Sequence, residues 1–253
     1  IDATALANWK TYKVAALGDT GENGGSDDRR FLFATDAVHF PGPPEYTFLM
    51  VGSGNREQPL ASNINDLFVV IKDTIQVGDS DSGSGLPSVK YLGDLTRKSQ
   101  FDLASGGALN LFDSSRKGYY IELENGEKTV NAALTVAGVT YFGTNKPNSP
   151  SPYACTSNLG IARGYAINFA SGTAVADRNA DGTVNRNDLY TTFTGGGLPP
   201  SPVTGVVEVD GKYIRFVIGG GGLGAAGSTI EGVRVQASPA SKRSPAYWYF
   251  NKD

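Results

Sequence analysis

The sequence has few of the residues that most catalytic and metal sites use, with one histidine, one cysteine and one methionine among 253 residues. The lone histidine, His39, excludes a histidine cluster for zinc. A serine triad or a cysteine nucleophile would need His39 as its base. This histidine stands where an expected strand ends, which favours a structural role. The lone cysteine, Cys155, indicates either a buried thiol or a disulfide partner that this sequence lacks.

Clustered positive charge and long apolar runs are also absent. The formal net charge is −3 and the isoelectric point is about 5.3, which argues against a nucleic-acid partner. No apolar run is long enough to span a membrane. No signal peptide is visible, but the chain begins with Ile1, so we expect a processed or trimmed piece, and the missing signal says little about export.

Glycine, by contrast, is abundant, with 33 residues, and 13 prolines accompany it. They separate short apolar or alternating runs, and helical periodicity is nearly absent, which predicts an all-β protein. The pairs Asp210-Gly211 and Ala137-Gly138 each predict a tight hairpin turn. The expected strands are 30–33, 47–51, 67–71, 119–123, 133–136, 139–142, 165–169, 206–209, 213–218 and 233–236.

Four segments within the expected strands suggest an internal repeat, because each contains an aromatic residue followed by aliphatic residues. These aromatic residues are Phe68, Tyr119, Tyr165 and Tyr213, so they lie roughly 50 residues apart. A four-stranded propeller blade occupies about 40–50 residues. The spacing therefore favours a β-propeller with about five blades' worth of chain over the alternative, an all-β sandwich.

The strongest chemical signal is the segment 177–188, Asp-Arg-Asn-Ala-Asp-Gly-Thr-Val-Asn-Arg-Asn-Asp. Oxygen-bearing side chains stand at positions 1, 3, 5, 9 and 12, and glycine stands at position 6, as in an EF-hand-type calcium loop. Position 7 would contribute its main-chain carbonyl, and position 9 would act directly or through a water. The alternative is a turn that merely favours Asn, Asp and Gly. The candidate calcium ligands are Asp177, Asn179, Asp181, Thr183, Asn185 and Asp188.

Two glycine-rich segments carry weaker signals. Segment 222–227 fits the dinucleotide pattern G-x-G-x-x-G, but no amphipathic helix follows, so we interpret it as a loop or bulge. Segment 52–60, Gly-Ser-Gly-Asn-Arg-Glu-Gln-Pro-Leu, follows a buried strand. It is either a turn between blades that charge-assisted hydrogen bonds lock, which we favour, or part of a ligand mouth.

Several segments resemble, in order, the C-terminal domain of the PilY/PilC family of type IV pilus biogenesis factors and tip adhesins. Segment 52–60 is specific to that family, and its combination with the calcium-type loop carries the resemblance. The matching segments are 28–33, 49–60, 117–123, 158–165, 177–188 and 197–202, and they extend from about residue 23 to the C-terminus.

The resemblance implies a modified seven-bladed β-propeller whose calcium loop, 177–188, is inserted between strands. Because the chain is too short for seven blades, we expect residues 1–253 to form a single propeller domain or the C-terminal part of one. The remaining blades would be absent or on another chain. The family often has Asp where this chain has Asn185, which would weaken calcium binding or shift more of it to Asp188. Cys155 lies where the family tends to have a disulfide cysteine.

The leading hypothesis is therefore a non-enzymatic, calcium-binding component of a pilus-tip adhesin and assembly factor that regulates pilus extension, retraction and surface attachment. The resemblance implies secretion through the periplasm to the pilus tip or bacterial outer surface. The expected partners are pilin or minor pilin subunits and a host or abiotic surface. The alternatives are a secreted, calcium-stabilised propeller enzyme, either a quinone-type dehydrogenase or a hydrolase, and a purely structural scaffold.

Overall fold

The computed structural model describes residues 12–18, 29–41, 44–74, 88–98, 109–148, 159–219 and 232–234. Two single turns of 3₁₀ helix lie among its strands, η2 (Leu92–Asp94) and η4 (Arg186–Asp188). The strands are β1 (Ala15–Ala16), β2 (Asp36–Phe40), β3 (Tyr46–Gly52), β4 (Leu67–Asp73), β5 (Lys90–Tyr91), β6 (Thr96–Lys98), β7 (Gly118–Glu122), β8 (Lys128–Thr129), β9 (Leu134–Val136), β10 (Val139–Lys146), β11 (Ile161–Asn168), β12 (Tyr190–Thr192), β13 (Val203–Val209), β14 (Lys212–Ile218) and β15 (Gly232–Arg234).

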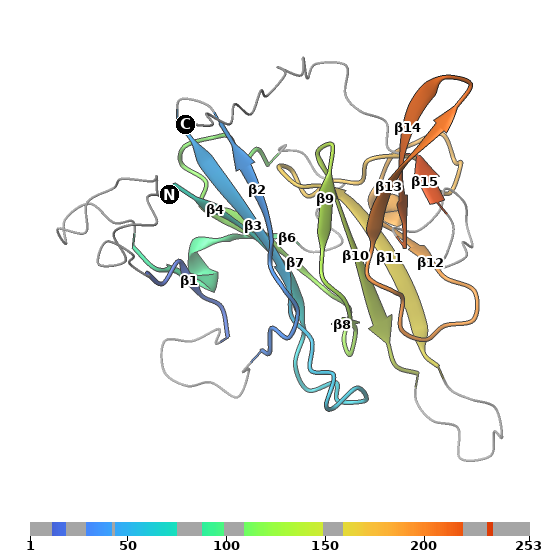
Figure 1. Cartoon of the computed structure of the whole chain (residues 1–253). Coiled ribbons are helices and arrows are strands. Elements are labelled where there is room, and N and C mark those ends of the chain that lie inside the picture. The colour runs from blue at the N-terminus through green and yellow to red at the C-terminus, as the bar shows by residue number, and fades with distance from the viewer. Residues whose placement is uncertain are drawn as a thin grey trace, which may run out of the picture.

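The described strands form four sheets, and the three larger ones stand side by side (Figure 1). The first of these has the order β2-β3-β4-β7-β6, and its last pair is parallel. The second has the order β12-β11-β10-β8, with β9 also paired to β10, and the third is β13-β14-β15. A short parallel pair, β1-β5, forms the remaining sheet. The chain is thus an all-β, propeller-like stack of sheets, which confirms the predicted fold class.

The main core lies between the two five-stranded sheets. Phe68 from β4 stacks on Phe142 from β10 with ring centroids 3.7 Å apart, and Phe142 stacks on Tyr165 from β11 at 4.7 Å. Both faces of the first sheet are covered, because a second cluster that includes Val69 and Leu92 packs on its other side. This explains why every residue of β4 is buried and why that strand is a continuous apolar run before Lys72.

A glycine at the end of β3 lets the two large sheets approach each other. A methyl group at Gly52 would come within 2.3 Å of the hydroxyl oxygen of Thr129 in β8. Between Gly52 and Gly54, the carbonyl of Ser53 accepts hydrogen bonds from the backbone N–H and the hydroxyl of Thr129, at 3.0 and 2.8 Å. The Gly-Ser-Gly sequence is therefore required by close backbone packing between sheets.

Most predicted strands are confirmed, and so are both hairpins. Ala137-Gly138 joins β9 to β10, and Asp210-Gly211 joins β13 to β14, with positive φ at all four residues. Positive φ at both central residues is the requirement of a type I′ turn. Segment 30–33 is not a strand. The carbonyl of Arg30 accepts an isolated hydrogen bond from the N–H of Gly54, and the segment does not pair with a neighbouring strand.

The interpretation of the repeat was wrong in one respect. Phe68 and Tyr119 belong to β4 and β7, which are neighbours in one sheet, whereas the repeat assumed one such strand in each blade. The spacing could not reveal this, because strand pairing depends on tertiary packing. The glycine-rich segment 222–227 and Cys155 lie outside the described residues.

No helix in the described part of the chain is long and apolar enough to cross a membrane.

We expect Gly52→Ala to lower the free energy of unfolding by about 1–3 kcal/mol, because the added methyl group overpacks the contact with Thr129. Gly93→Ala is the matched control, since no atom lies within 4 Å of the added methyl group there. Urea denaturation of both variants measures the difference. Equal stability of the two variants would contradict the role assigned to Gly52.

Candidate metal centre

The segment 177–188 lies between β11 and β12 of the second sheet and ends in η4. Its backbone turns sharply, with φ of 57° at Ala180 and 87° at Gly182. Both values lie in the left-handed region, which glycine adopts readily and alanine does not. The glycine predicted at the sharp turn of the loop therefore occupies a position that needs it.

The carboxylates of Asp177 and Asp181 accept hydrogen bonds from backbone N–H groups of the loop. Asp177 Oδ2 accepts the N–H of Gly182 at 2.8 Å, and its Oδ1 accepts the N–H of Asp181 at 3.3 Å. Asp181 Oδ1 accepts both the hydroxyl and the N–H of Thr183, at 2.7 and 2.8 Å. These bonds, with the Thr183 hydroxyl the largest cause, lower the pKa of Asp181. Asp181 is therefore ionised at neutral pH, as a metal ligand must be.

Asp188 closes the loop from inside the protein. Its side chain is fully buried, and its Oδ1 accepts the N–H groups of Arg178 and Asn179 at 2.7 and 3.2 Å. Its Oδ2 accepts the N–H of Asn185 at 2.8 Å. A carboxylate offers about four acceptor positions, so three backbone donors leave room for about one further bond. In this arrangement Asp188 is first a brace for the loop, and it has little capacity to bind a metal with both oxygens.

The side-chain amide of Asn185 contacts two further oxygens of the loop. Its Nδ2 donates to the carbonyl of Thr183 at 3.2 Å and to Asp181 Oδ2 at 3.3 Å. Asn179 Nδ2 also donates to Asp181 Oδ2, at 2.9 Å. These acceptors are hard oxygens of the kind that Ca²⁺ prefers. Rotation of a side-chain amide exchanges its nitrogen and oxygen. Asn185 could then present an oxygen at the same point, but the bond that its Oδ1 accepts from the N–H of Asn187 at 2.8 Å would be lost.

The donor set fits Ca²⁺ chemically, but its carboxylates alone do not make a cluster. Across the described ranges, no three His, Cys, Asp or Glu side chains stand close enough together to hold a metal ion without other ligands. A site in this loop would combine carboxylates with the carbonyl of Thr183 and the amide of Asn185. Metal binding would require the side-chain amide of Asn185 to rotate, so that its oxygen takes the position of its nitrogen.

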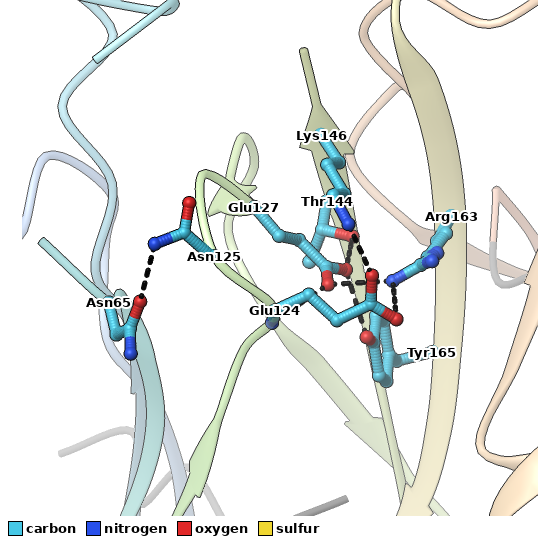
Figure 2. A network of polar contacts seen from close by, with 8 residues as sticks. All are labelled: Asn65, Glu124, Asn125, Glu127, Thr144, Lys146, Arg163 and Tyr165. Atoms are coloured by element: carbon cyan, nitrogen blue, oxygen red, sulfur yellow. Dashed lines mark hydrogen bonds and ion pairs between the residues drawn. The ribbon is translucent and has the colours of Figure 1, made fainter. Parts of the chain in front are cut away.

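A buried charge network adjoins β10 and β11, and sequence analysis did not identify it (Figure 2). Glu127, which is fully buried, accepts bonds from the hydroxyls of Thr144 and Tyr165 at 2.5 and 2.9 Å. Arg163 Nη1 lies 2.7 Å from Glu127 Oε2 and 2.9 Å from Glu124 Oε1. Burial, with Glu127 as a further cause, raises the pKa of Tyr165 well above its ordinary value, so its hydroxyl remains a donor.

The network extends in two directions, toward the surface and toward the first sheet. Lys146 Nζ reaches Glu124 Oε2 at 2.6 Å. Burial raises the pKa of Glu124, but Arg163 and Lys146 outweigh burial and the net pKa is lowered. Asn125, from the same turn, contacts Asn65 at 3.4 Å (Figure 2). One signal could have revealed the network: Arg163 is a charge inside an otherwise apolar strand, and such a charge needs a buried partner.

Two other features that the sequence analysis considered, segment 52–60 and His39, make contacts that hold the fold together. Arg56 lies over the ring of Phe33 at 5.4 Å, and Glu57 forms an ion pair with Arg30. These contacts support the favoured interpretation of segment 52–60 as a turn locked by charged groups. His39 lies in β2, with Nε2 2.9 Å from Glu45 Oε1 across the hairpin.

Fold and site together define an all-β, propeller-like protein with an Asp- and Asn-rich loop between two strands of one sheet. No family model matches the sequence, and no curated protein is similar to it in sequence. The fold is similar to the crystal structure of the C-terminal domain of Pseudomonas aeruginosa PilY1, with a TM-score of 0.54 and 13% identity. The match covers 84% of this chain and 46% of that one, so this chain spans less than half of the PilY1 domain.

We expect Asp188→Asn to destabilise the protein by roughly 1.5–3 kcal/mol, because the amide cannot accept all three backbone N–H groups and loses the charge that strengthens them. Asn187→Ala is the control, since that side chain is exposed beside Asp188. Thermal denaturation in the presence of a chelator separates this effect from metal binding. If both variants unfold at the wild-type temperature, Asp188 does not brace the loop.

We expect Arg163→Met to cost about 3–5 kcal/mol, because it leaves Glu127 buried without a cation. Lys146→Met removes a partly exposed partner of Glu124 and should cost no more than about 1 kcal/mol. Adding Glu127→Gln to Arg163→Met should recover part of the loss, as a double-mutant cycle would measure. A recovery of zero would show that the two side chains do not act as a pair.

Proposed function

We propose that this protein is a calcium-binding, non-enzymatic component of a type IV pilus tip adhesin or assembly factor. The observation that carries the proposal is the loop 177–188 between two strands of a propeller-like sheet, in which an oxygen of Asp181 and the carbonyl of Thr183 meet at the side-chain amide of Asn185. The fold likeness to the PilY1 C-terminal domain supports the link to the pilus. It also supports a location outside the cell, at the pilus tip or on the bacterial outer surface.

Charge repulsion within the loop explains how calcium would act. Asp181 is exposed, Asp177 is half-buried, and the two are close in sequence, so without a cation their charges oppose the tight turn. Bound calcium would supply two positive charges at the point where Asn185 now donates. At a free calcium concentration of about 100 times the dissociation constant, binding would stabilise the folded loop by roughly 2.7 kcal/mol. The ordered loop would then present a fixed surface to pilin or minor pilin subunits.

The third sheet, β13-β14-β15, exposes apolar side chains that another part of a larger assembly could cover. Val206, Val207, Val209 and Tyr213 of the β13–β14 hairpin are all exposed, and Tyr213 is 77% exposed. The chain also spans 46% of the PilY1 domain. We therefore propose that further blades of the propeller, from another chain or from another part of the same protein, cover this hairpin. Attachment to a host or abiotic surface would be a property of that larger assembly.

Isothermal titration calorimetry tests the metal site. The wild-type protein should bind calcium, and Asp177→Asn combined with Asp181→Asn should abolish the binding while the fold remains. Glu208→Gln is the control, because it removes an exposed carboxylate on β13, in a different sheet. Unchanged calcium affinity in the double variant would reject the site. Normal pilus assembly and attachment in cells that carry the double variant would reject the calcium-dependent pilus role.

A further inference from the structure

A small cavity of about 50 Å³ lies beside the loop between β3 and β4, far in sequence from the loop 177–188. Its lining is strongly cationic: it contains Arg29, Arg30 and Lys128, together with one acid, Asp66, and three side-chain amides. Two lining residues, Asn55 and Gln58, belong to segment 52–60, for which the sequence offered a ligand mouth as the less favoured alternative. The other walls come from segments distant in sequence, such as Arg29 and Lys128, which the pattern did not connect with it.

Arg29, which lines this cavity, has a buried donor that lacks an acceptor. Its Nε donates to the carbonyl of Asn65 at 2.8 Å, which fixes the guanidinium group in place. Its Nη1 is buried and has no hydrogen-bond partner. A buried donor without a partner is costly, so an oxygen ligand that reaches Nη1 would gain a charge-assisted hydrogen bond.

Three cations and one acid line the cavity, and one of the cations, Arg30, also forms an ion pair with Glu57. Lys128, which is 5% exposed, donates from Nζ to the carbonyls of Ala61 and Gly126, the latter at 3.2 Å. An ammonium group has three donors, so one remains. The opposing acid, Asp66, is already bonded to the hydroxyl of Ser53 at 2.6 Å. Burial raises the pKa of Asp66, and Ser53, Lys128 and Arg29 only partly offset this.

We propose that this cavity binds a carboxylate group, held by Arg29 with Lys128 and Arg30. One water needs roughly 10–15 Å³ on the same measure, so the cavity has room for about three or four heavy atoms, which is the size of a carboxylate. A guanidinium group binds carboxylates with two parallel hydrogen bonds. The carboxylate belongs either to a small free acid or to the terminus of a polypeptide, and the site does not depend on the metal loop.

A titration followed by nuclear magnetic resonance tests this proposal with defined probes. Sodium acetate represents the free acid, and triglycine with a free or an amidated C-terminus represents the polypeptide. Acetate should shift the Arg29 side-chain Nε–H signal and the backbone signals of residues 53–66 in a saturable way, whereas sodium chloride at equal ionic strength should not. Tighter binding of free triglycine than of acetate or the amide would identify a polypeptide terminus as the ligand, and tighter binding of acetate would identify a small acid.

Two variants separate a specific site from general ionic effects. Arg29→Gln should weaken acetate binding at least about tenfold, because a charge-assisted hydrogen bond is lost. Arg56→Gln is the matched control: this residue lies in the same loop, between the lining residues Asn55 and Gln58, but its side chain packs over Phe33 and does not line the cavity. If Arg29→Gln does not fold, Arg30→Gln, which is half exposed, should still weaken binding. Shifts that do not saturate, or that persist unchanged in the folded variants, would overturn the proposal.

Discussion

The crossing of the Gly52–Gly54 strand end over Thr129 is the contact on which the rest of the structure depends. Ser53 connects three elements there: its hydroxyl bonds Asp66 and the N–H of Leu67, and its carbonyl accepts two bonds from Thr129. These bonds hold the first large sheet against the second while burying no unpaired group of Ser53. Only a residue flanked by glycines can come so close to another strand.

The two residues before Thr129 contribute to the cationic cavity and to the buried charge network. Lys128 lines the cationic cavity, and Glu127 anchors the buried network on β10 and β11. The network positions Arg163 beside Gly164, whose carbonyl accepts a long bond from Arg178 at 3.4 Å. Arg178 is the second residue of the Asp-rich loop, and Asp188 accepts its N–H. Polar contacts and adjacent positions in the chain therefore connect the sheet crossing to the loop.

Local patterns in the sequence predicted those features that depend on neighbouring residues. The hairpins at Asp210-Gly211 and Ala137-Gly138 follow from the backbone angles that a two-residue turn demands. The left-handed glycine of the Asp-rich loop follows from the same preference. The repeat failed because similar strands can occur within a sheet as well as between sheets, and β4 and β7 are paired. The short strands, such as β8, carry too few residues for a pattern to be recognised.

The chemistry available to this chain was already set by its composition: one histidine, a turn-rich β pattern and a concentrated run of Asp and Asn. Folding determined which of those groups could meet. Asp188 became a buried brace because three backbone N–H groups point at it, and Arg29 and Lys128, which are distant in sequence, line one cavity. Such meetings depend on contacts between residues that are distant in sequence, and a linear pattern contains no information on which distant residues approach each other.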